Sequence, residues 1–221
     1  MRSPVVPTLL ALALAAAAPA QVHRDQETGY QITPPRDMEP VQNPGFIASK
    51  YGVAIFQATK PFPTKEGYEY YFRMYCFLFP GQQTVVTTGE PEKGEGPPEE
   101  NDWQNTENFF KRYFNRVYRN FDELAKDQIK GFYFGAPEQK SIGGIEVTIK
   151  PMIFEKLANL PQQWLVALYT VKGDQFAVLL TCPTERFDKY KPQMMATFGS
   201  FKVLDKEKGL TLKEMKPPVS T

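Results

Sequence analysis

The sequence predicts a single domain of mixed α and β structure behind an N-terminal export signal. Three observations support this prediction. Residues 1–20 have the pattern of a secretory signal peptide, the C-terminal half contains short strand-like runs separated by turn residues, and apolar residues recur at helical spacing over residues 103–130. The chain that remains after removal of the signal is long enough for one domain with a sizeable core.

The first twenty residues combine a charged start, an apolar middle and a small-residue end. Arg2 supplies the charge, Val5–Ala18 is nearly all apolar, and Ala18-Pro19-Ala20 has small residues at positions −3 and −1. We therefore expect cleavage after Ala20 and a periplasmic or secreted location. The alternative, a membrane anchor, needs about 20 apolar residues, which is longer than this run. The mature chain is accordingly not expected to insert stably in a membrane.

The N-terminal half of the mature chain alternates polar segments with strand-like ones. Residues 21–29 are polar, and we expect them to be flexible. Tyr30–Ile32 alternates and stops at two prolines, so it predicts a short strand. Residues 45–59 predict a hairpin around Lys50-Tyr51-Gly52, and residues 67–79 predict a strand, although their length also suits a buried helix.

Residues 80–102 include the run GEPEKGEGPPEEN, which predicts a solvated acidic loop. The stretch from Trp103 to Lys130 places aromatic and aliphatic residues on one helical face. Asp102 or Thr106 is a candidate N-cap and Gly131 a candidate end. We interpret the aromatic stripe as core packed against a sheet rather than as a ligand site.

The C-terminal half predicts a meander of strands followed by a short helix. Gly143-Gly144 and Lys172-Gly173-Asp174 are turn signals between apolar runs. A helix is expected to start at Pro183-Thr184 with Thr184 as its cap, and residues 205–221 form a polar tail. The predicted strands are residues 132–134, 139–142, 145–154, 163–171 and 175–182.

The chemistry-bearing residues give no motif for catalysis, a cofactor or a metal. His23 is the single histidine and lies three residues past the expected cleavage site, which excludes a histidine-dependent triad or zinc site in the domain. The chain has 26 basic and 25 acidic residues, and Arg2 leaves with the signal, so the mature chain is neutral and no nucleic-acid partner is expected. A hydrolase using carboxylates alone stays open; its candidates are Glu146, Glu155, Asp174, Glu185 and Asp188.

Cys76 and Cys182 are the two cysteines, and both fall in apolar segments. In an oxidising compartment they could form a disulfide that closes a long loop, worth about 4 to 5 kcal/mol in the chain-entropy model. The alternative is two separate buried thiols that act as small apolar residues.

The runs SIGGIEVTI, QQWLVALYTVKGDQFAVLLTCP and FDKYKPQMMATFGSFKV resemble the PsbP-like family, which includes the photosystem extrinsic subunit, DcrB-type bacterial envelope proteins and a Ran-binding import factor. In that family a glycine-containing turn precedes the meander and the last helix closes with a Ser-Phe pair, here Ser200-Phe201. The resemblance covers residues 30–204 in outline. It implies an α+β fold, an antiparallel sheet flanked by helices in an α/β sandwich, and members that are mostly binders and assembly factors.

Export, neutral charge and the missing catalytic motifs favour a non-enzymatic binding or assembly module that contacts another envelope or extracellular protein. The expected binding surface is the aromatic stretch with Tyr68, Tyr70, Tyr71 and Tyr75. One alternative is a carrier of a small apolar or aromatic ligand, which needs a cavity of about 300 Å³ or more. The other is the carboxylate-only hydrolase, which needs two carboxyl groups in one cleft.

Overall fold

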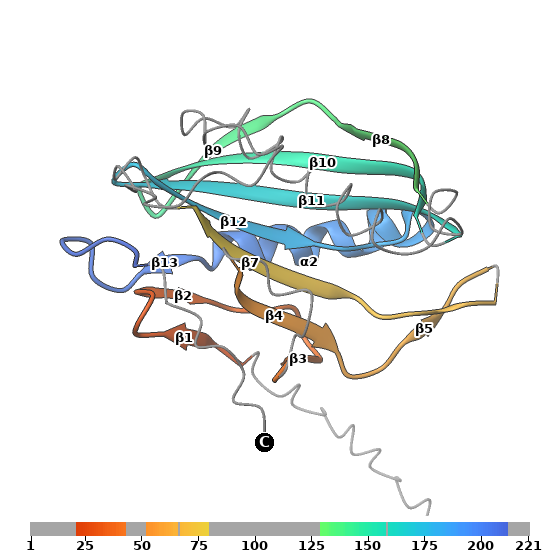
Figure 1. The fold of residues 1–221 in the computed structure, drawn as a ribbon, viewed down its shortest axis with the longest axis horizontal. Helices are drawn as coiled ribbons and strands as arrows, with labels where there is room; N and C mark the ends of the chain where they lie inside the picture. Colours follow the sequence, from red (N-terminus) through yellow and green to blue (C-terminus); the bar gives the residue numbers. More distant parts are fainter. Residues whose placement is uncertain (1–20, 43–51, 66, 80–128, 158, 212–221) are drawn as a thin grey trace, which may run out of the picture.

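A computed structural model describes residues 21–42, 52–65, 67–79, 129–157 and 159–211. Its main feature is an eight-stranded sheet in the order β3-β4-β7-β12-β11-β10-β8, with β9 paired to β10 beside β8 (Figure 1). All its neighbouring strands are antiparallel. The strands are β3 (Met38–Pro40), β4 (Gly52–Ala58), β7 (Arg73–Phe79), β8 (Ile129–Phe134), β9 (Glu138–Ile142), β10 (Ile145–Leu157), β11 (Leu160–Val171) and β12 (Asp174–Leu180).

The predicted meander is confirmed. It forms because its turns are short and contain the residues that tight hairpins need. Lys172 and Gly173 join β11 to β12 with φ values of 51° and 88°, and Gly143 and Gly144 join β9 to β10 at 60° and 80°. Two successive positive φ values characterise the type I′ turn, whose twist matches that of the flanking strands. The register then follows from the turn, with Val171 opposite Asp174 and Leu165 opposite Leu180.

One proline lies inside the long strand β10 without breaking it. Pro151 is opposite Leu165 of β11, and its carbonyl accepts a hydrogen bond from the Gly135 amide at 2.9 Å. The nitrogen of Pro151, which carries no hydrogen, therefore faces the edge of β10 that pairs with β8 and β9, at the gap between those two strands. No ladder hydrogen bond is lost there, which is the condition under which a strand tolerates proline.

Both faces of the sheet are buried at its centre, which is why the sequences of β11 and β12 are almost continuously apolar. In β11, Leu165, Ala167 and Tyr169 face one way and Val166 and Leu168 face the other, all at 3% exposure or less. Successive side chains of a strand point to opposite faces, so each strand supplies two cores.

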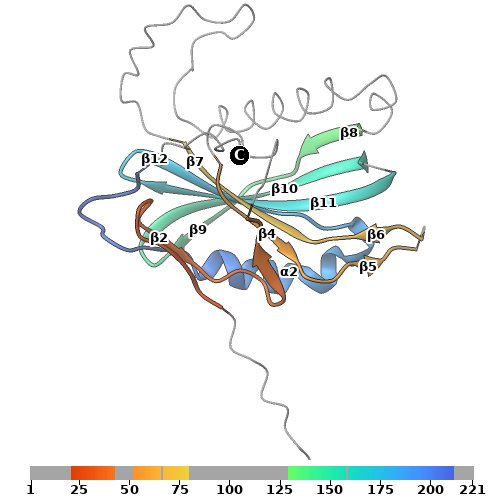
Figure 2. The same cartoon turned by 60° about the horizontal axis from the view of Figure 1, so that its bottom comes forward.

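Helix α2 (Phe187–Gly199) covers one face of the sheet (Figure 2). A small sheet of β1 (His23–Asp25), β2 (Tyr30–Ile32) and β13 (Lys202–Val203) contributes to the same core. Aromatic rings pack against one another there: Tyr169 stacks on Phe201 at a centroid distance of 4.1 Å, and the tilted rings of Tyr30 and Phe176 lie 4.5 Å apart.

The Ser200-Phe201 pair ties the end of α2 to the small sheet. The Ser200 hydroxyl accepts the Thr33 amide hydrogen at 2.8 Å and donates to the Thr197 carbonyl at 2.6 Å, while Phe201 is 1% exposed. The pair that carried part of the family resemblance therefore fixes the strand after the helix in place.

Two segments expected to be loose are packed. Residues 21–29, predicted to be flexible, contain β1 and a turn in which the buried Asp25 carboxylate accepts hydrogen bonds from the amide of Thr28 and from its hydroxyl. The predicted polar tail packs as far as residue 211, because Leu210 is buried and the Thr211 amide donates to the Thr28 carbonyl. Residues 212–221 lie outside the described residues.

Three further predictions are wrong in detail. The expected strand 67–79 is two strands, β6 (Glu69–Tyr70), which pairs with β5 (Phe62–Pro63), and β7. Thr184 makes no capping hydrogen bond; it starts a 3-10 turn (Thr184–Arg186) that leads into α2. The helix predicted to reach Lys130 cannot do so, because β8 begins at Ile129, where it pairs with Leu157.

Other predictions fall outside the described residues. These are the signal peptide, the acidic loop 80–102, residues 103–128 of the predicted helix and the first arm of the hairpin 45–59. The second arm of that hairpin is β4, which pairs with β3 and β7. Within the described residues, no helix has the length and apolar character needed to cross a bilayer.

Candidate functional site

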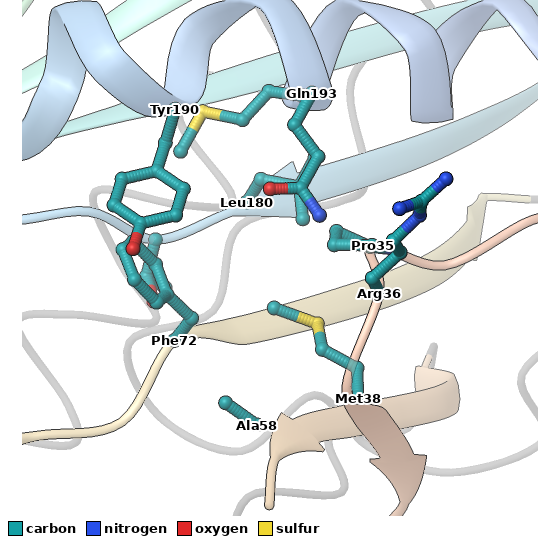
Figure 3. Close-up of a pocket in the computed structure, with 10 residues that line it drawn as sticks. Pro35, Arg36, Met38, Ala58, Phe72, Leu180, Tyr190 and Gln193 are labelled. Atoms are coloured by element: carbon teal, nitrogen blue, oxygen red, sulfur yellow. The ribbon is translucent and has the colours of Figure 1, made fainter. Parts of the chain in front are cut away.

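An apolar groove lies where α2 meets the end of the sheet that carries β3 and the start of β7 (Figure 3). The groove has a volume of about 50 Å³. It is lined by Pro35, Arg36, Met38, Ala58, Phe72, Leu180, Thr181, Tyr190, Gln193 and Met194.

The floor of the groove is part of the core, and its walls are partly open. Leu180 and Met194 are 1% and 3% exposed, which fixes their positions by packing. Phe72 and Tyr190 are half-buried and meet at a centroid distance of 4.3 Å, and Met38 is half-buried on the opposite wall. Methionine side chains adapt to different apolar shapes, so a groove with two of them can accommodate more than one side chain.

Polar groups gather at the mouth of the groove. Arg36 is exposed and follows β2, and Figure 3 shows its side chain on the same side of the groove as Gln193 of α2. The Lys189 ammonium lies 5.6 Å from the centroid of the Tyr190 ring, within the range of a cation–π contact. The site thus combines an apolar interior with positive charge at its rim.

An aromatic cluster continues from the groove onto the β5–β6 hairpin. Phe62 stacks on Phe72 at 4.9 Å, and Tyr70 meets Phe72 edge to face at 5.9 Å. The Arg186 guanidinium lies 5.4 Å from the centroid of the Phe62 ring. Aromatic rings and arginine are the residues that most often anchor protein interfaces.

The four tyrosines predicted as one binding surface do not lie together. Tyr68 is 47% exposed near the turn of the β5–β6 hairpin, and the Tyr70 hydroxyl donates to Gln162 at 3.0 Å, where burial raises its pKa above the ordinary value. Tyr75 packs with the core on the face opposite α2, where it stacks on Phe77 at 6.3 Å, and Tyr71 is half-buried. Tyr70 therefore contacts Phe72, a wall residue of the groove, whereas Tyr75 lies on the opposite face of the sheet.

The two cysteines are free and buried. Cys76 is opposite Val178, and Cys182 lies four residues beyond Val178, so their Cα atoms are roughly 13 Å apart, too far for a disulfide. Burial raises the pKa of Cys182 to about 12, and burial likewise raises the pKa of Cys76. The bridge considered above is thus contradicted, and both thiols act as buried apolar groups.

The carboxylates considered for catalysis lie elsewhere. Glu146, Glu155, Glu185 and Asp188 are exposed, and neither they nor Asp174 line the groove. His23 donates to or accepts from the Tyr30 hydroxyl at 3.2 Å. Within the described part of the chain, no three histidine, cysteine, aspartate or glutamate residues gather as a metal site would require.

No protein-family model matches the sequence, and no curated protein sequence matches it significantly. The structure, however, is similar to cyanobacterial PsbP (CyanoP) from Synechocystis sp. PCC 6803, with a TM-score of 0.51 and 16% identity over 83% of this chain and 91% of that one. The chain has the PsbP-like fold. The resemblance noted in the sequence, and the α+β class it implied, are confirmed.

Two other structures are similar to this PsbP-like domain at lower scores. The Ran-binding protein Mog1p from Saccharomyces cerevisiae has a TM-score of 0.49 and 7% identity, over 85% of this chain and 96% of that one. LpqN, involved in cell envelope biogenesis of Mycobacterium tuberculosis, has a TM-score of 0.42 and 10% identity, over 85% of this chain and 86% of that one.

The residues of the groove were not found by sequence reasoning. Met38, Ala58 and Gln193 come from three separate elements and form no motif. The available signal was Tyr190 and Met194, two apolar residues four positions apart on the second predicted helix. The partial exposure of Tyr190 depends on how far the helix extends past the sheet, which spacing alone does not give.

Proposed function

We propose that this PsbP-like domain is a binding module that receives part of a protein partner in the groove beside α2, outside the cytoplasm. The observation that carries the proposal is the groove itself, with core residues as its floor and half-buried aromatic and methionine side chains as its walls. The exposed Tyr68 and the half-buried Tyr70 extend the proposed surface along the β5–β6 hairpin.

The size of the groove favours a side chain over a free ligand. Pockets that hold drug-sized molecules measure roughly 300 to 1,000 Å³. The groove has about 50 Å³, room for one aliphatic side chain or a few methylene groups. An attached side chain also gains the contacts that its backbone makes with the rim, so a small anchor is sufficient for a protein partner. The groove therefore does not support the carrier hypothesis.

The proposed location rests on the signal sequence. Cleavage after Ala20 would leave β1, which starts at His23, intact, so export and folding of the domain are compatible. Mass spectrometry of the chain isolated from its host tests this directly. A mature N-terminus at Gln21 in the extracytoplasmic fraction is expected, and an intact Met1 in the cytoplasm would refute it.

Site-specific photocrosslinking in the native host tests the binding site. A benzophenone side chain at Gln193, at the mouth of the groove, is expected to crosslink to one discrete protein. The same probe at Lys140, on the far strand β9, is the control.

A second change assigns the crosslink to the groove. Ala58→Trp fills the groove and is expected to abolish the Gln193 crosslink, whereas Ala136→Trp at an exposed position outside the groove leaves it unchanged. A crosslink that survives Ala58→Trp, or equal products at Gln193 and Lys140, would contradict a binding site in the groove.

A further inference from the structure

We propose that the partner presents an apolar side chain next to a carboxylate, with the apolar group in the groove and the carboxylate at Arg36. This inference rests on the proposed function and names the chemistry of the partner. The inference is carried by two positively charged side chains near the groove that form no ion pair within the described residues.

Arg36 is the one charged residue among those that line the groove. It is exposed, and within the described residues its guanidinium forms no hydrogen bond and no ion pair. Pro35 precedes it, and the carbonyl of the following residue, Asp37, accepts the Thr59 amide at 2.8 Å, so the backbone that carries the guanidinium is held at the edge of the sheet. A guanidinium without an ion-pair partner among the described residues, beside an apolar groove, is suited to bidentate recognition of a carboxylate.

Lys189 adds a second positive charge next to one wall of the groove. Its ammonium lies over the ring of Tyr190, one wall of the groove, and forms no ion pair within the described part of the chain. The neighbouring Arg186 differs, because Glu185 lies 3.8 Å from it. Arg36 and Lys189 are thus the cations near the groove whose charge is available to a partner.

The acidic residues of these elements are directed elsewhere. Asp188 precedes Tyr190 by two positions, which places it about 200° around the helix from the wall residue. Glu39 alternates with Met38 along β3 and so faces the other side of the sheet. Asp37 is exposed but does not line the groove. A partner carboxylate at Arg36 therefore meets positive charge in the groove and no acidic lining residue.

The amide of Gln193 completes the recognition site. It lies on the same side of the groove as Arg36 (Figure 3) and can donate to a carboxylate or to a peptide carbonyl. Two peptide sources supply the required chemistry: an aspartate or glutamate within a chain, or the carboxylate of a C-terminus that follows an apolar residue. The experiment separates them.

Two random heptapeptide libraries probe the mature protein, one fused at both ends and one with a free C-terminus. Enrichment of peptides with an apolar residue and a carboxylate within two positions is expected. Enrichment confined to the second library would identify the C-terminal carboxylate as the source. Binding of a selected peptide is then expected to weaken roughly tenfold in Arg36→Glu and to fall with added salt, as for a lost charge-assisted contact.

Two control variants separate the role of the charge from the role of the groove. Lys202→Glu changes another exposed positive charge, on β13, and is expected to leave the affinity within about twofold. Groove-dependent peptides without acidic groups, lost in Ala58→Trp but unaffected by Arg36→Glu, would overturn this inference and leave the proposed function standing. The absence of any peptide that depends on the groove in both libraries would overturn both.

Discussion

Removal of a single hydroxyl group from the core is expected to loosen the attachment of α2 to the sheet. Tyr169 of β11 is fully buried, and its hydroxyl donates to the Phe198 carbonyl in the last turn of α2 at 2.8 Å. The substitution Tyr169→Phe keeps the ring, which stacks on Phe201 at 4.1 Å, and removes this hydrogen bond alone.

The expected loss of stability depends on which hydrogen bonds the Phe198 carbonyl retains in Tyr169→Phe. A buried acceptor left without a partner costs about 1 to 3 kcal/mol, whereas a neutral hydrogen bond contributes about 0.5 to 1.5 kcal/mol net. The Phe198 carbonyl also accepts the Phe201 amide hydrogen at 3.3 Å, so it is not left unpaired. We expect Tyr169→Phe to lower the free energy of unfolding by about 1 kcal/mol, which lowers Tm by about 2 to 4 °C in a chain of this length.

Urea and thermal unfolding of the mature protein at pH 7 measure this difference. Tyr133→Phe is the control, because Tyr133 is 50% exposed and its loss is expected to change the free energy by less than about 0.5 kcal/mol. Equal stability of Tyr169→Phe and the parent would refute the reasoning, since it would mean that the hydroxyl gains nothing over water.

The dependence on pH gives the same prediction a second check. Burial raises the pKa of Tyr169 well above its ordinary value, so the folded state holds the neutral phenol. Its contribution to stability is fully present below about pH 10, the pKa in the unfolded chain, and is lost as the pH rises further. The stability difference between the parent and Tyr169→Phe should therefore be constant from pH 6 to 8 and shrink above pH 10.

Two other predictions concern the cysteines and the face of the sheet opposite α2. Because the pKa of Cys182 is about 12, iodoacetamide at pH 8 should leave it unmodified in the folded protein and alkylate it in urea; rapid alkylation of the native protein would show that the site is open. Replacing residues 80–128 by a flexible linker leaves Trp164 as the sole tryptophan. If the segment 103–128 covers Phe154 and Trp164, the fluorescence emission of Trp164 should shift to the red. The far-UV circular dichroism of the strands should be retained. An unchanged spectrum would place that segment elsewhere.

The sequence predicted the C-terminal strands well because their determinants are local. Lys172-Gly173 fixes both the hairpin and its register, and the alternation in Ile145–Ile149 fixes which face of β10 is buried. Residues 21–29 were missed for the opposite reason. Their polar side chains are satisfied within a turn around Asp25, and the strand they form is stabilised by β2, whose other partner, β13, lies near the far end of the chain.

The candidate site was only partly predictable. Of the four tyrosines predicted as a binding surface, Tyr70 contacts Phe72 of the groove and Tyr68 is exposed on the β5–β6 hairpin. Tyr75 was grouped with them by proximity in sequence, yet a strand alternates its side chains, and the two-residue break at Tyr71-Phe72 separates β6 from β7. Positions such as Arg36 depend on which elements meet in space, and nothing in the local sequence marks them.

The pairing of early strands with late ones has a consequence for folding during synthesis. Tyr30 of β2 is opposite Val203 of β13, and Cys76 of β7 is opposite Val178 of β12, so one edge of β2 and one edge of β7 stay unpaired until the C-terminal strands have been made. Long-range pairing of this kind also folds slowly. Neither sheet can therefore be completed before β12 and β13 have left the ribosome, so the final packing of the domain is a post-translational event.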